Sequence, residues 1–124
     1  MSRARKRITA KHLQKDAIVY VRRQSAEQSV TQAASQTGLA ETARRWGWPE
    51  HQVHVIEDLG RAGTSLSPRP GFSEVLRRID EGTVGALIVR DLTRLSRDPD
   101  ELKKLMRQAK KAKTLVLTSP EMEN

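Results

Sequence analysis

The sequence predicts an α/β domain with a mostly parallel central sheet of four or five strands. Four short apolar runs rich in β-branched residues read as strands, and stretches with helical periodicity lie between them. Three of the runs lack polar/apolar alternation, which is typical of strands buried on both faces. A chain of 124 residues with 36% hydrophobic and 3% aromatic residues has room for one modest, mostly aliphatic core.

The predicted strands cover residues 17–21, 53–56, 86–89 and 115–117. The first predicted helix covers roughly 27–45, although Gly38 inside it costs about 1 kcal/mol. The second covers about 72–81, where apolar residues recur at helical spacing and Gly82 marks the end. The third covers about 99–111, with Asp98 as N-cap and Pro99 in the first turn. The elements therefore alternate as β-α-β-α-β-α-β.

The formal net charge of +8 and the isoelectric point of about 10.4 favour a polyanionic partner. Residues 1–15 contain six basic residues and no acid, so the rest of the chain is nearly neutral. We expect a flexible basic arm over 1–15, because a block of like charges buries too little to fold, and a folded domain over 16–124. A merely solubilising tail is the alternative for the arm.

Several function classes are excluded by composition. The chain has no cysteine, hence no disulfide, thiolate zinc site or cysteine nucleophile. No apolar run approaches the ~20 residues of a membrane span, and the N-terminus lacks the apolar region of a secretory signal. The three histidines, His12, His51 and His54, are scattered and suggest no metal cluster. We expect a cytoplasmic protein.

Ligands of parallel sheets bind beyond the carboxyl ends of the strands, where this sequence gathers arginines. The polar residues that follow the first three strands are Arg22, Arg23, Gln24, Ser25, Glu57, Asp58, Arg61, Arg69, Arg90, Asp91, Arg94 and Arg97. Arg94 and Arg97 are three residues apart and share a face if the segment is helical. Because guanidinium groups grip phosphate with a planar fork, this edge is a predicted phosphate site. Chance clustering of surface arginines is the alternative.

The chain resembles the N-terminal catalytic domain of serine site-specific recombinases, the resolvase–invertase family. The matching pieces are residues 17–25, Glu57-Asp58 with Gly63, Arg69-Pro70-Gly71-Phe72, and 92–97. The resemblance covers about residues 8–119, and Trp46-Gly47-Trp48-Pro49 is similar to one subgroup. It implies a resolvase-like three-layer fold.

The resemblance also implies a reaction. In this family a serine attacks a DNA phosphodiester, forms a 5′-phosphoserine and releases a 3′-hydroxyl; subunits rotate and the reverse step rejoins the strands. No metal or high-energy cofactor is needed, the partner is double-stranded DNA, and full-length proteins act as dimers or tetramers in bacteria or phages. Motif matching assigns Ser25 as nucleophile and Arg69, Arg94 and Arg97 to the scissile phosphate. Tyr20, Asp58 and Thr93 would orient these groups. The arm residues Arg3, Arg5, Lys6 and Arg7 are the expected DNA contacts.

Three departures from the family pattern stand out. The usual Tyr-x-Arg-x-Ser has one extra residue here, so Arg22 keeps its spacing to Tyr20 and Arg23 keeps its spacing to Ser25. Since strand side chains alternate between faces, only one of the two arginines fits the site without a bulge, and we favour Arg23. Ala62 replaces a common serine, and Thr93 replaces a common aspartate.

The sequence therefore predicts the catalytic domain of a DNA strand transferase, ending before the oligomerisation helix and the DNA-binding region. We expect the isolated chain not to recombine two sites. The alternatives are a non-catalytic nucleic-acid-binding or regulatory remnant of the fold and a small α/β domain for another phosphorylated ligand. Integrase, resolvase and invertase are not distinguished by these residues.

Overall fold

The computed structural model describes residues 8–23, 38–59, 70–90, 92, 95, 96 and 98–118. The strands are β1 (Asp16–Arg23), β2 (Val53–Leu59), β3 (Val84–Val89) and β4 (Leu115–Thr118). The helices are α2 (Ala10–Leu13), α4 (Pro70–Asp80) and α5 (Pro99–Ala112), with a 3-10 turn η2 (Glu50–Gln52). Residues 38–45 are also helical.

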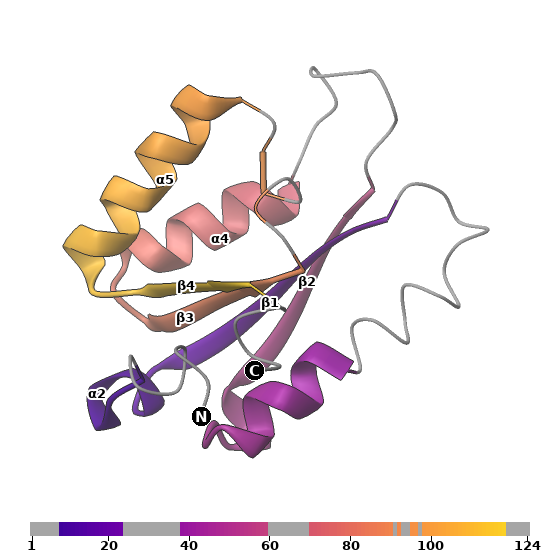
Figure 1. Cartoon of the computed structure of the whole chain (residues 1–124), viewed down its shortest axis with the longest axis vertical. Helices are drawn as coiled ribbons and strands as arrows, with labels where there is room; N and C mark the ends of the chain where they lie inside the picture. The colour runs from indigo at the N-terminus through magenta and orange to yellow at the C-terminus, as the bar shows by residue number, and fades with distance from the viewer. Residues whose placement is uncertain are drawn as a thin grey trace.

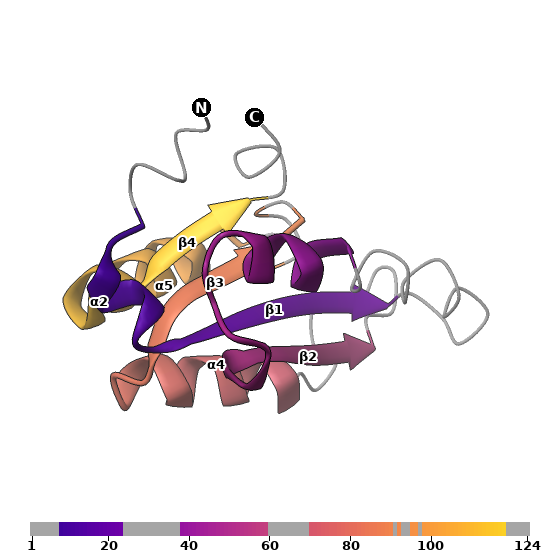
Figure 2. The same cartoon turned by 90° about the horizontal axis from the view of Figure 1, so that it is seen from below.

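The four strands form one parallel sheet in the order β2-β1-β3-β4 (Figures 1 and 2). From β1 the chain moves to one side to make β2 and then crosses to the other side of β1 to make β3. The direction of winding therefore reverses at β1, and the carboxyl ends of β1 and β3 flank the point where open α/β sheets bind ligands. The predicted α/β class and parallel sheet are confirmed.

Helices cover both faces of the sheet, which gives the predicted three layers (Figures 1 and 2). On one face α4 and α5 pack on a cluster that contains Ile18, Leu87, Val75 and Leu105. On the other face α2 and the 38–45 helix pack on a second cluster, built around Val19, Ile88, Ala43 and Trp48. No helix among the described residues is long and apolar enough to cross a membrane.

Burial follows the place of each strand in the sheet. All of β3 and residues 17–21 of β1 are buried, as expected for the two central strands of a covered sheet. β2 lies at an edge and exposes alternate residues, including Val55 at 41%. The strands run one to three residues beyond the predicted apolar runs, because polar residues such as Asp58 still take part in the parallel pairing.

The described helices begin and end at local signals. α5 agrees with the prediction: the Asp98 carboxylate accepts a hydrogen bond from the Asp100 N–H at 3.0 Å, and Lys113 ends the helix in the left-handed conformation. α4 begins at Pro70, two residues before the predicted start. Of the predicted helix over 27–45, residues 27–37 lie outside the described residues.

The structure differs from the expected flexible arm over residues 8–15. Ile8 and Leu13 pack against the core cluster beneath the 38–45 helix. The Trp48 Nε1–H donates to the His12 carbonyl at 3.1 Å, and the Gln52 amide donates to two further carbonyls of this segment at 3.0 and 2.8 Å. The prediction rested on charge alone and did not take these apolar and backbone contacts into account. Residues 1–7 of the expected arm lie outside the described residues.

Candidate functional site

The carboxyl edge of the sheet is where the sequence places the site. β1 and β2 pair in register up to Arg23 and Leu59, at this edge. The predicted nucleophile and phosphate-binding residues, Ser25, Arg69, Arg94 and Arg97, lie outside the described residues, as does Thr93, which was predicted to orient them. The structure nevertheless describes the residues that hold the chain on either side of them.

Asp58, near the end of β2, is the most strongly engaged polar residue at this edge. Its side chain is only 3% exposed. One carboxylate oxygen, Oδ1, accepts the Gly71 N–H at 2.7 Å. The other, Oδ2, accepts the Phe72 N–H at 2.7 Å and the Tyr20 hydroxyl at 2.6 Å. Three short bonds to one carboxylate satisfy the buried charge that would otherwise be costly.

Asp58 therefore caps α4 from a different element. The first N–H groups of a helix have no partner within the helix, and here two of them donate to this carboxylate. A negative charge at this position also complements the helix dipole. This external cap explains why α4 starts at Pro70, earlier than its apolar periodicity indicates.

Gly71 allows the helix to approach β2 this closely. A Cβ at this position would lie 2.8 Å from the Glu57 carbonyl oxygen and 2.9 Å from both Asp58 Oδ1 and Ile56 Cγ2. Two of these three atoms belong to β2 backbone or to the capping carboxylate, so they cannot yield without breaking the cap. The glycine is thus required by close packing of helix on strand.

Tyr20 ties β1 to the same junction. It is 1% exposed, and its ring meets the Phe72 ring edge-on, with centroids 6.0 Å apart and planes at 67°. With its hydroxyl on Asp58, Tyr20 joins β1, β2 and the first turn of α4. We call these four residues, Tyr20, Asp58, Gly71 and Phe72, the Tyr-Asp junction. Arg69 immediately precedes it in the chain.

After β3, two residues that the sequence prediction did not single out anchor the arginine-rich segment. Leu95 is fully buried in the α4/α5 cluster, and Ser96 is 4% exposed. Their N–H groups donate to the Leu92 carbonyl at 3.1 and 3.3 Å, and the Ser96 hydroxyl accepts the Asp98 N–H at 3.0 Å. A leucine within a basic segment and a Ser-x-Asp pattern were the available signals. These contacts hold Leu95 and Ser96 against the core and against the start of α5.

The pairing of β1 with β2 bears on the extra residue before Ser25. Arg22 lies in register with Asp58, and Arg23 with Leu59, with no irregularity in this part of the ladder. The irregularity in β1 lies instead at Asp16 and Ala17, in its pairing with β3. The extra residue is therefore not absorbed by a bulge within β1.

The histidines stand apart from this edge. His54 Nε2 lies 3.3 Å from an Asp16 carboxylate oxygen, and His12 Nδ1 bonds to Thr9. Within the described ranges no three histidine or acidic side chains come together as a possible metal site. These histidines serve local structure.

Comparisons with known proteins agree with this geometry. Residues 17–123 match the family model described as Resolvase, N terminal domain. An uncharacterized protein of Sinorhizobium fredii, y4bA/y4pH, is 32% identical over 115 residues, which are 90% of this chain; the chain spans 17% of the length of that relative.

Solved structures of serine recombinases have the same fold. The N-terminal catalytic domain of TP901-1 integrase is 25% identical, with a TM-score of 0.69 and coverage of 87% of this chain and 80% of that one. The C-terminal catalytic domain of ISC1926 TnpA, an IS607-like serine recombinase, is 16% identical, with a TM-score of 0.70 over 83% of this chain and 68% of that one. A serine recombinase from Sulfolobus solfataricus is 24% identical, with a TM-score of 0.65 over 87% and 74%. With its fold and family match, this chain belongs to the resolvase family of serine recombinases.

Proposed function

We propose that this domain cleaves and rejoins DNA strands in site-specific recombination through a 5′-phosphoserine intermediate. The observation that carries the proposal is the Tyr-Asp junction, which joins the elements adjoining Ser25 and Arg69 at one edge of the sheet. The contacts of Leu95 and Ser96, which are neighbours of Arg94 and Arg97 in the sequence, support a site after β3. Membership of the resolvase family supports the same chemistry.

In the proposed reaction the Ser25 hydroxyl oxygen attacks the scissile phosphorus. The bond from phosphorus to the 3′ oxygen breaks, which leaves a 5′-phosphoserine and a free 3′-hydroxyl. The same 3′-hydroxyl, or that of a partner strand, attacks in reverse and releases the serine. Negative charge grows on the phosphoryl oxygens in the transition state, and Arg69, Arg94 and Arg97 stabilise it. The partner is duplex DNA, and strand exchange requires paired subunits.

The register of β1 favours Arg22 over Arg23 as the active-site arginine, which reverses the preference from the sequence. Arg22 is two residues beyond Tyr20 on a regularly paired strand and lies beside Asp58 in the ladder. Residues two apart on a strand share a face, so position 22 belongs to the face that α4 covers. Arg22→Ala should therefore slow cleavage much more than Arg23→Ala. The opposite ranking would restore Arg23 to this role.

The nucleophile is tested with a nicked or suicide duplex and the full product of the gene that encodes this chain. A covalent protein–DNA adduct should form, and Ser25→Ala should abolish it while the neighbouring Ser29→Ala retains it. An adduct of normal yield from Ser25→Ala would refute the assignment. DNA binding without any adduct from the unaltered protein would favour the non-catalytic alternative.

The arginines are tested by separating chemistry from affinity. Groups that act as charge develops lower the barrier without tightening ground-state binding. Losing one such stabiliser costs about 2.7–4 kcal/mol, so Arg69→Ala, Arg94→Ala and Arg97→Ala should each cleave roughly a hundredfold more slowly or worse. Arg44→Ala, exposed on the opposite side of the sheet, is the matched control. Equal losses of binding and cleavage would make the residue a simple phosphate anchor.

A further inference from the structure

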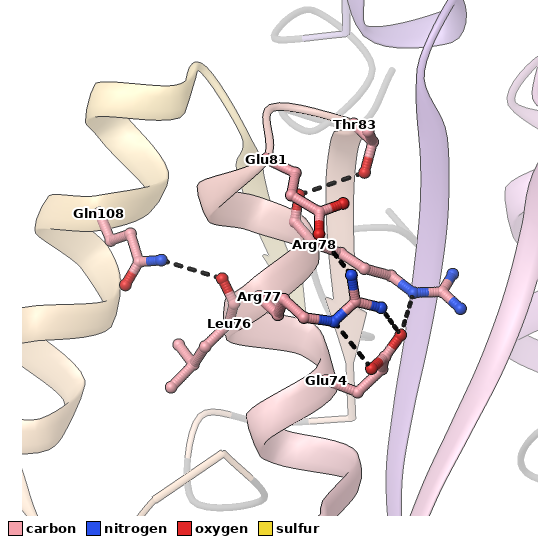
Figure 3. A network of polar contacts seen from close by, with 7 residues as sticks. All are labelled: Glu74, Leu76, Arg77, Arg78, Glu81, Thr83 and Gln108. Carbon is pink, nitrogen blue, oxygen red and sulfur yellow. Dashed lines mark hydrogen bonds and ion pairs between the residues drawn. The ribbon is translucent and has the colours of Figure 1, made fainter.

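One face of α5 packs against the hydrophobic core. Leu105 and Ala109 are 1% and 2% exposed, and Leu102 and Ala112 pack half-buried against the same cluster. At 3.6 residues per turn, these four positions fall within an arc of about 80°. Gln108, at the border of this arc, donates from Nε2 to the Leu76 carbonyl of α4 at 3.0 Å, which fixes the rotation of α5 about its axis (Figure 3).

The opposite face of α5 is mostly basic, and the acid on the same face, Asp100, lies in the first turn. Its five exposed basic residues are Lys103, Lys104, Arg107, Lys110 and Lys111. They fall within an arc of about 120° whose centre is directly opposite the buried arc. Residues 102–113 contain no acid. We call these five residues the α5 basic face.

In the neighbouring helix α4, the basic side chains form ion pairs with nearby acids. Arg77 pairs with Glu74 and Glu81, and Arg78 pairs with Glu74 at 2.9 Å (Figure 3). In the part of the chain that the structure describes, no residue of the α5 basic face forms such an ion pair. The two helices on this face of the sheet therefore differ in charge pairing. The arginines of α4 are balanced by paired acids, whereas the cations of the α5 basic face are not.

Helix stability does not account for this arrangement. Cations are favourable near a helix C-terminus, which suits Lys110 and Lys111 in the last turn. Lys103 and Lys104 lie in the first half of α5, where the dipole gives cations no such benefit. Asp100 stands three and four residues before them, but among the described residues it forms no ion pair with either lysine. Like charges at i, i+4, as at 103 and 107, are themselves destabilising. The face therefore fits an external anionic partner better than it fits a role in folding.

The position of the face indicates which anion. α5 begins at Pro99, two residues after Arg97, so the face continues from the proposed site along the helix. From 103 to 110 the helix rises about 10.5 Å, which corresponds to about three phosphates of one strand of duplex DNA. An anionic membrane suits the face less well, because a helix that lies on a bilayer inserts its apolar face, and that of α5 is buried against the sheet.

We propose that the α5 basic face binds the phosphate backbone of the duplex that flanks the cleavage site, independently of sequence. The proposal rests on the proposed function for the identity of its partner, double-stranded DNA. It assigns to α5 a positioning contact that lies outside the reacting groups.

The test compares two triple variants of the whole chain that remove the same charge. Lys103→Gln/Arg107→Gln/Lys110→Gln alters the α5 basic face, and glutamine keeps a comparable helix propensity. Lys11→Gln/Arg44→Gln/Arg45→Gln removes three exposed charges from the opposite side of the sheet. Binding to two unrelated duplexes of about 30 base pairs is measured by fluorescence anisotropy across a salt titration, with circular dichroism and melting temperature as checks of folding.

The α5 variant should lose about 2.7 from the slope of log K against log salt, since each lost phosphate contact removes about 0.9. Its affinity near 0.1 M salt should fall at least about tenfold on both duplexes, while the control variant changes little. Equal losses in the two variants would overturn the proposal in favour of a net-charge effect. Loss of binding to phosphatidylserine vesicles with duplex binding intact would overturn it in favour of a lipid surface. Neither duplex binding nor vesicle binding requires DNA cleavage. A negative result for the α5 basic face therefore leaves the Ser25 adduct test unaffected, and a negative adduct test leaves these binding measurements unaffected.

Discussion

The Tyr-Asp junction should behave as one cooperative unit. Tyr20→Phe removes the 2.6 Å hydrogen bond to a buried carboxylate and leaves the aromatic contact with Phe72 in place. Hydrogen bonds to charged groups contribute about 1.5–3 kcal/mol, so the free energy of unfolding should fall by about that amount. Asp58→Ala removes three hydrogen bonds, one from the Tyr20 hydroxyl and two from helix N–H groups, and we expect a loss of about 3–5 kcal/mol, a large part of the stability of a small domain.

The assay is urea unfolding followed by far-UV circular dichroism, with Asp58→Ala, Tyr20→Phe and the double variant forming a thermodynamic cycle. Because the hydroxyl and the carboxylate are in direct contact, the coupling energy should be about 1–2 kcal/mol. Additivity within about 0.3 kcal/mol would refute the junction as a unit. Single-turnover cleavage by folded Tyr20→Phe supplies a second readout. If Tyr20 positions the reacting groups, cleavage should be slower while DNA binding is unchanged. If its role is purely structural, both the cleavage rate and DNA binding should be unchanged.

Three further predictions concern stability. Gly71→Ala should destabilise the folded domain by about 1–3 kcal/mol because its Cβ collides with β2 and the capping carboxylate. Gly38→Ala, in helical backbone with open space around it, should stabilise the domain by up to about 1 kcal/mol. Equal urea midpoints for the two variants would contradict this prediction. Deleting residues 1–15 should lower the melting temperature sharply because packed α2 is lost, while deleting 1–7 should lower only DNA affinity and its salt dependence; equal melting temperatures would refute the packing role of α2. Hydrogen bonds from Arg77 and then Arg78 lower the pKa of Glu74. Its contribution is therefore present above the unfolded pKa and disappears as pH falls through the lower folded value, so Glu74→Gln should melt slightly below the unaltered protein at pH 7, with the gap closing at acid pH.

Much of the local structure could be read from the sequence. Three apolar runs without alternation predicted strands buried on both faces, and β1 and β3 are buried in this way. β4 lies at the sheet edge and is half-buried except at Leu117. Asp98 and Pro99 predicted the start of α5, because a cap involves residues only two apart. The Asp58 cap of α4 spans thirteen and fourteen residues between different elements, so no local pattern revealed it and the predicted helix started late.

The sequence was less informative where charge and packing compete. The six basic residues in 1–15 indicated a flexible arm, yet Ile8, Leu13 and backbone carbonyls hold residues 8–15 on the sheet. For the site, family motifs brought Tyr20 and Asp58 to attention, and the structure joins them across 38 residues. Motif spacing could not show whether position 22 or 23 follows the face of Tyr20, because that depends on an unbroken strand register.

By itself, the sequence determined the α/β class and the four strands, since hydrophobic period and capping act over a few neighbouring residues. The arginine-rich carboxyl edge stays a prediction. Only the tertiary structure decided the strand order, the packing of residues 8–15 against the core, the Asp58 carboxylate as the external cap of α4, and the separation of balanced charges on α4 from unbalanced ones on α5. Each of these depends on groups distant in the chain that meet only after the sheet has formed, and their energies come from burial and hydrogen bonding across elements.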